Sequence, residues 1–347
     1  MKNIGNKILL ILGVIKMKIH YSSSLWSKDK GRWGLPQRVN WEFDYADSKR
    51  CIPTIYRFPK GIVFDIITFL DEGSLHEYFK KYESIEEKLT SIERHCAEQE
   101  HPYQQVPVKD ICINGKHVEN GYSSSSAISV PWDRNDDILL PVRRTYSSIL
   151  NDTSCFACER FCIPYPEAES RVKNILRFLQ IDKVNNMKLS THSRQRFYPL
   201  NISFEMSAEE NEKDICFIHP ITNIVHKIYL QNPKFIEIPL PNESRSVYAL
   251  QSGYEIEPNL QNGDTLQFNS SLQYDEAQIL SKNKYHPKSA SSIGIIGGAE
   301  KDITCGLHGL PLHNCFSILN LNPINIWDFK IEGINIKEHD SEEFSLK

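Results

Sequence analysis

Four potential metal ligands lie close together near the C-terminal end of the sequence: Cys305, His308, His313 and Cys315. Thiolates and imidazoles are ligands that zinc prefers, and four of them can form a tetrahedral site. Paired zinc ligands are usually separated by about two to four residues, whereas only one residue separates His313 from Cys315. The four residues are therefore metal candidates, but the mismatch favours a protein that holds no cofactor.

Two further histidines lie in a predicted hairpin, residues 214–230. A turn at Thr222 and Asn223 would place His219 directly opposite His226, with Cβ atoms about 4.5–5.5 Å apart. Period-two alternation puts both imidazoles on a face that is otherwise apolar. We interpret them as a structural pair bonded to backbone, and keep a metal half-site as the alternative, since imidazole serves in both roles.

Such a half-site would need a third ligand, for which His192 and Asp65 are the candidates. Asp65 interrupts the apolar run at residues 61–70, which predicts a strand buried on both faces. A buried carboxylate must be paired or protonated, and this one either has a catalytic role or bonds an arginine or a backbone amide.

The remaining motifs do not assemble an active site. Cys155, Cys158 and Cys162 are spaced by three and four residues, which places them on one helical stripe and indicates core packing. The glycines at positions 294, 297 and 298 lack the spacing of a dinucleotide-binding loop. Catalytic residues therefore stay unknown, and no cofactor-binding residue is expected.

Residues 292–299, SIGIIGGA, resemble the IGIIGGADGPT segment of the β-subunit of sodium-translocating decarboxylases. The match ends at residue 299, and that membrane subunit's transport function and functional residues do not carry over. More broadly, the chain is similar to a family of uncharacterised soluble bacterial proteins in four stretches: residues 52–65, 217–226, 292–299 and 326–331. This resemblance spans most of the chain and implies no activity.

Composition narrows the function classes. The chain has 347 residues, 40% hydrophobic and 24% charged, and a net charge of -4. An ordinary globular composition without a basic excess argues against nucleic acid as a partner. Nine irregularly spaced cysteines fit free thiols in a reducing cytoplasm better than a secreted disulfide framework.

The N-terminal apolar run, residues 8–15, is too short to cross a membrane. We expect residues 1–16 to be an extension without a structural role, ahead of a peripheral anchor or a secretion signal. A chain beginning at Met17 should then keep its melting temperature.

The predicted elements define an α+β protein. A mixed α/β part over residues 17–183 carries loops and short strands at 21–60, the strand at 61–70, helices at 85–98, 143–161 and 167–180, a turn at Asn114-Gly115 and a serine loop at 123–126. An antiparallel, β-sandwich-like part follows over residues 184–283. Residues 284–347 form a glycine-rich segment and C-terminal strands, with fraying after residue 338.

The function expected from these features is non-catalytic binding or regulation, with an unknown protein or small molecule as the ligand. Two alternatives remain open. One is a metal-dependent enzyme that uses His219 and His226, and the other is a membrane-associated factor anchored by residues 8–15.

Overall fold

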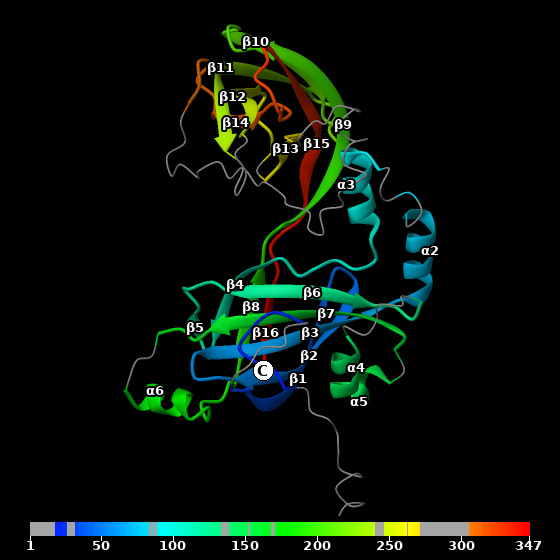
Figure 1. Ribbon diagram of the computed structural model, residues 1–347, viewed down its shortest axis with the longest axis vertical. Coiled ribbons are helices and arrows are strands. Elements are labelled where there is room, and N and C mark those ends of the chain that lie inside the picture. Colours follow the sequence, from blue (N-terminus) through cyan, green and yellow to red (C-terminus); the bar gives the residue numbers. More distant parts are fainter. Residues whose placement is uncertain are drawn as a thin grey trace, which may run out of the picture. The chain divides into compact units, whose positions relative to one another are not determined.

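The computed structural model describes residues 18–25, 32–82, 85, 89–132, 139–151, 153–167, 171–239, 246–261, 263–270 and 305–347. These residues belong to two compact units (Figure 1). The first contains the chain up to Glu86, Glu100–Ser193 and Asp340–Lys347, and the second contains Glu87–Gln99 and Arg194–His339. The predicted α+β class is confirmed, because antiparallel sheets dominate and a few helices accompany them.

Two antiparallel sheets form the first unit. The larger has the order β1, β2, β3, β7, β6, and the smaller has the order β16, β8, β4, β5. Their bounds are Leu35–Tyr45 (β1), Ser48–Arg57 (β2), Gly61–Leu70 (β3), Cys155–Pro164 (β7), Ser123–Ser129 (β6), Glu343–Leu346 (β16), Met187–Thr191 (β8), Val108–Ile113 (β4) and Lys116–His117 (β5). One apolar core takes side chains from both sheets, including Phe64 and Phe161 from the larger and Leu189 and Leu346 from the smaller.

The sequence signals for β3 and the β4–β5 hairpin are confirmed. Nine of the ten residues in β3 are buried, as expected for a near-continuous apolar run covered on both faces. Asn114 and Gly115 have φ angles of 52° and 78°, the positive values that a tight two-residue hairpin turn requires.

Helices of the first unit are α2 (Glu72–Tyr82), α4 (Leu140–Thr145), α5 (Ser147–Leu150) and α6 (Arg171–Phe178), and α3 (Ser91–Glu100) lies almost wholly in the second unit. Asp71 begins α2, since its carboxylate accepts the backbone N–H of Ser74 at 2.7 Å. Thr90 and Glu93 form a reciprocal capping box that begins α3. The helix predicted from residue 85 therefore begins later, at Ser91.

The second unit also consists of two antiparallel sheets, with the orders β10, β11, β12, β14 and β13, β15, β9. Their bounds are Glu212–Ile218 (β10), Val225–Pro239 (β11), Ser246–Glu257 (β12), His313–Phe316 (β14), Thr265–Phe268 (β13), Ile326–His339 (β15) and Arg194–Ser207 (β9). Its core combines Leu230 and Leu250 of the first sheet with Trp327 and Phe329 of the second.

Four predicted elements are wrong. Residues 155–161 belong to strand β7 rather than to a helix, residues 123–126 begin strand β6, and residues 21–60 include the long strands β1 and β2. The C-terminal residues do not fray, because β16 pairs with β8 and buries Leu346. In each case pairing with another strand decided the conformation, and local residue types do not report such pairing.

None of the helices in the described parts of the chain is long and apolar enough to cross a membrane. Predictions for residues 1–16 and for the glycine segment at 292–299 lie outside the described residues.

Candidate ligand-binding cavity

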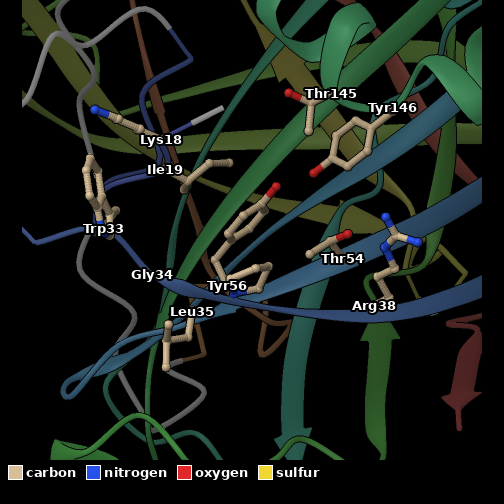
Figure 2. Close-up of a pocket in the computed structure, with 11 residues that line it drawn as sticks. Lys18, Ile19, Trp33, Gly34, Leu35, Arg38, Thr54, Tyr56, Thr145 and Tyr146 are labelled. Carbon is tan, nitrogen blue, oxygen red and sulfur yellow. The ribbon is translucent and has the colours of Figure 1, made fainter. Parts of the chain in front are cut away.

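A cavity of about 470 Å³ lies in the first unit, where the beginning of β1 runs beside β2 (Figure 2). Strand register explains which side chains meet there. Pro36 and Arg38 of β1 pair directly with Tyr56 and Thr54 of β2, and residues two apart on a strand share a face. The lining residues are Lys18, Ile19, Trp33, Gly34, Leu35, Pro36, Arg38, Thr54, Tyr56, Thr145 and Tyr146.

Gly34 lets the segment that carries Lys18 approach the sheet. Its N–H donates to the carbonyl of Ile19 at 3.1 Å, which ties this segment to the beginning of β1. A Cβ atom at Gly34 would lie 2.6 Å from the ring of Phe58 and 2.8 Å from Cβ of Tyr56. Any larger residue at position 34 would therefore displace the wall of the cavity.

The cavity carries positive charge at exposed positions. Lys18 and Arg38 are both exposed, and none of the described lining residues is acidic. The ammonium of Lys18 lies 4.2 Å from the ring centroid of Trp33, a cation–π contact. No ion pair joins Lys18 or Arg38 to a carboxylate within the described part of the chain, so both charges are available to an anionic ligand.

Two buried tyrosines supply polar atoms in the interior of the cavity. The hydroxyl of Tyr146 donates to Asp65 Oδ2 at 2.9 Å, and the hydroxyls of Tyr56 and Tyr146 share a hydrogen bond (Figure 2). Because Tyr146 uses its single hydrogen on Asp65, Tyr56 donates to Tyr146 and keeps lone pairs for an acceptor role. The cavity therefore offers cations at exposed positions and a hydrogen-bond acceptor among its buried residues.

Burial keeps both tyrosines neutral. It raises the pKa of Tyr56 to about 12. Burial, followed by the charge of Asp65, raises the pKa of Tyr146 well above its ordinary value. Both phenols therefore act as hydrogen-bonding groups and not as bases near neutral pH.

Both carboxylate oxygens of Asp65 are bound by an arginine. Arg160 holds both of its oxygens, with Nε–Oδ1 and Nη2–Oδ2 distances of 2.7 and 3.0 Å. Of the roles predicted for Asp65, the structure shows the bond to an arginine. His192 is exposed and its N–H donates to the carbonyl of Pro107.

The predicted pairing of the two hairpin histidines is wrong by two positions. His226 pairs with Phe217, because a four-residue turn, residues 220–223, replaces the expected two-residue turn: the N–H of His219 donates to the carbonyl of Ile224. The predicted face is right, since both histidines are only 3% exposed. Their ring centroids lie 5.8 Å apart.

Hydrogen bonds define the tautomers of this pair. Nδ1 of His219 accepts the N–H groups of Ile221 and Thr222 at 3.3 and 3.2 Å, which places the proton of the neutral ring on Nε2. Nδ1 of His226 donates to the carbonyl of Pro258 at 2.7 Å. These backbone bonds are those expected of a structural pair.

The four-residue cluster Cys305, His308, His313 and Cys315 diverges in space. His308 stacks on Tyr229 with a 4.0 Å centroid distance, and His313 stacks on Tyr254 at 5.2 Å. Cys315 is buried, whereas Cys305 is exposed. Over the whole described part of the chain, no three His, Cys, Asp or Glu residues are grouped so that they could hold a metal ion.

Buried Glu255 organises the loop that carries this cluster. Its carboxylate accepts the N–H groups of His308 at 3.0 Å and Leu310 at 2.8 Å, and the side-chain amide of Gln231 at 2.6 Å. A Cβ atom at Gly306 would lie 2.4 Å from Cδ of Glu255. Glu255 therefore fixes the loop around His308 and Leu310 through backbone N–H groups.

The three cysteines at positions 155, 158 and 162 lie on strand β7, and each contributes to a different apolar cluster. Their predicted role in core packing is confirmed, although their helical placement is wrong. All nine cysteines of the sequence lie in described segments, and none of them forms a disulfide bond.

Comparison of the chain with models of protein families, with curated proteins and with solved structures gives no match.

Sequence reasoning missed the cavity residues. They come from four separate segments, around positions 18–19, 33–38, 54–56 and 145–146, so no local spacing marks them. The one usable signal was the loose association of aromatic and basic residues near the N-terminus: Lys18, Trp33 and Arg38.

Proposed function

We propose that this chain is a cytoplasmic, non-catalytic binding protein whose cavity in the first unit takes a small anionic molecule with an aromatic body. The observation that carries the proposal is the lining itself: two exposed cations, no described acidic residue, and a buried tyrosine acceptor in one cavity. A carboxylate or phosphate would pair with Lys18 and Arg38, and a ring bearing an N–H or O–H would lie against Tyr56.

The cytoplasmic assignment is supported by nine cysteines that form no disulfide bond within the described segments. We further propose that the two sheets of the second unit pack as a sandwich, because one apolar core contains side chains of both. The metal-dependent alternative has less support, since no three His, Cys, Asp or Glu residues in the described segments are grouped so that they could hold a metal ion. The anchor alternative concerns residues 8–15, which lie outside the described residues.

A matched pair of probes tests the binding proposal. Indole-3-acetate has an anionic group, an aromatic ring and an N–H donor, whereas indole-3-acetamide has the same shape without the charge. Calorimetric titration of the full chain should show preferential binding of the acetate. Arg38→Gln should weaken acetate binding by about tenfold or more, as expected for a hydrogen bond to a charged group, and should leave acetamide binding unchanged.

The control is Arg144→Gln, because Arg144 is an exposed arginine on α4 that does not line the cavity. Tyr56→Phe should weaken both probes, since it removes the acceptor for their common N–H group. Equal binding of the two probes, or equal effects of Arg38→Gln and Arg144→Gln, would contradict the proposal.

A further inference from the structure

Helix α6 presents its apolar side chains to solvent. The exposed fractions are 65% for Val172, 58% for Ile175, 36% for Leu176 and 53% for Leu179. These positions follow an i, i+3, i+4, i+7 spacing, which forms one stripe along a helix. In an ordinary surface helix this stripe faces the core, so the orientation of α6 is reversed. Phe178 and Ile181, which are 64% and 52% exposed, extend the apolar surface.

The buried side of α6 is polar and firmly held. The guanidinium of Arg177 lies 4.5 Å from the ring centroid of Tyr165 and donates to the carbonyl of Pro166 at 2.7 Å. At the end of the helix, the side-chain amide of Gln180 donates to the carbonyl of Arg57 at 3.0 Å. These contacts fix the rotation of α6 within the first unit, so its apolar stripe cannot turn inward without breaking them.

An exposed apolar patch of this kind marks an interaction surface. The same chain carries a second apolar stretch, residues 8–15, which contains eight consecutive residues without a charge or a polar side chain. Burying either apolar surface from water is favourable, and contact between the α6 patch and residues 8–15 would bury both.

Connectivity favours a contact within one chain. The described chain begins at Lys18, which two residues separate from the apolar run. The next residue, Ile19, packs with Tyr56 and Phe58, and the Arg57 carbonyl between these two residues accepts the bond from Gln180. Both apolar stretches are thus attached near one end of β2. An extended stretch of eight residues spans roughly 26 Å. Because residues 8–15 and α6 belong to one chain, the effective concentration of the apolar run at the helix is raised.

We propose that residues 8–15 dock on the exposed face of α6 formed by Val172, Ile175, Leu176 and Leu179. This would give the N-terminal segment a structural role, in place of the dispensable extension that the sequence alone suggests. The proposal is independent of the ligand-binding function, since none of these four residues lines the cavity.

Hydrogen–deuterium exchange of the full chain tests this contact. Amides of residues 8–15 should exchange at least about tenfold more slowly than in an unstructured peptide. The double variant Ile175→Glu, Leu179→Glu should abolish that protection, because two carboxylates would be buried in the contact. The matched control is Ile218→Glu, Val225→Glu, at two positions of the second unit that are each 60% exposed.

Three results would overturn the proposal. Unprotected amides at residues 8–15 in the full chain would show that no docking occurs, and protection that survives the α6 variant would place the docking elsewhere. Protection that appears only with dimer formation in sedimentation, or only with anionic phosphatidylserine vesicles, would assign the face to a second copy or to a membrane surface.

Discussion

Asp65 of β3 and Arg160 of β7 are directly opposite each other in the larger sheet of the first unit and are joined by two hydrogen bonds. Their side chains are 0% and 6% exposed. Burial alone would lower the pKa of Arg160, but the charge and hydrogen bonds of Asp65 raise it instead. The pair also accepts the hydroxyl of Tyr146, so a buried ion pair and the cavity tyrosines form one network.

Breaking this ion pair on one side should be strongly destabilising. Asp65→Ala leaves the charge of Arg160 buried without its carboxylate counter-ion, and we expect the free energy of unfolding to fall by about 3–5 kcal/mol. Urea denaturation measures the change. The double variant Asp65→Leu, Arg160→Met should lose much less, because it removes both charges. Equal losses in the two variants would show that packing, and not charge, determines the effect.

Alkaline pH should destabilise the first unit through its buried tyrosines. The pKa values of Tyr56 and Tyr165 are raised by burial to about 12 from an ordinary value of 10.0. A raised pKa stabilises the folded state fully below pH 10, and this contribution is lost as the pH rises towards 12. Denaturation midpoints measured between pH 9 and pH 11 should fall, and less steeply in Tyr56→Phe. An identical slope in the variant would exclude Tyr56 as a source.

Acidic pH should loosen the loop that Glu255 holds. Burial opposes ionisation of this carboxyl, but the N–H groups of His308 and Leu310 outweigh it, so the pKa of Glu255 is lowered from 4.5. A lowered pKa contributes stability above the ordinary value, and this contribution disappears as the pH falls through the folded-state pKa.

Exchange protection of residues 306–310 should therefore decrease in acid, and Glu255→Gln should reproduce the loss at neutral pH. Glu257→Gln is the control, since Glu257 lies on the same strand but is exposed and bonds Tyr229. If residues 306–310 show the same exchange protection in both variants, Glu255 does not hold the loop.

Removing the two hairpin histidines should affect stability and not metal content. Their Nδ1 atoms bond backbone groups, so His219→Gln with His226→Gln should cost about 1–3 kcal/mol, the scale of buried hydrogen bonds. Elemental analysis by mass spectrometry should find no stoichiometric zinc or iron in the purified chain. Stoichiometric metal that disappears in His219→Ala, His226→Ala would restore the metal-dependent alternative.

The sequence predicted those elements whose conformation is determined by a few neighbouring residues. The apolar run of β3 and the Asn114-Gly115 turn were both readable, because period and turn chemistry are contained within a few residues. By contrast, Cys155, Cys158 and Cys162 fit a helical stripe as well as a buried strand, and only pairing with β3 decides between the two.

For the candidate sites too, local features were predictable from the sequence and long-range contacts were not. The buried face of His219 and His226 was predictable from alternation, but their register depended on a turn in which Asn223 has a φ of 59°. The position of His308 depends on Glu255, about fifty residues earlier, and no spacing rule connects the two residues. The ligand cavity was not predicted, since its walls meet only after β1 and β2 have paired.

The division of the chain has a consequence for its synthesis. The polypeptide passes between the two units at four points, and the strand that completes the smaller sheet of the first unit is β16, Glu343–Leu346. On the ribosome, synthesis must therefore reach Leu346 before this residue can enter the core that contains Phe64. A nascent chain that stops before this strand exposes the edge of β8, and unpaired strand edges favour aggregation.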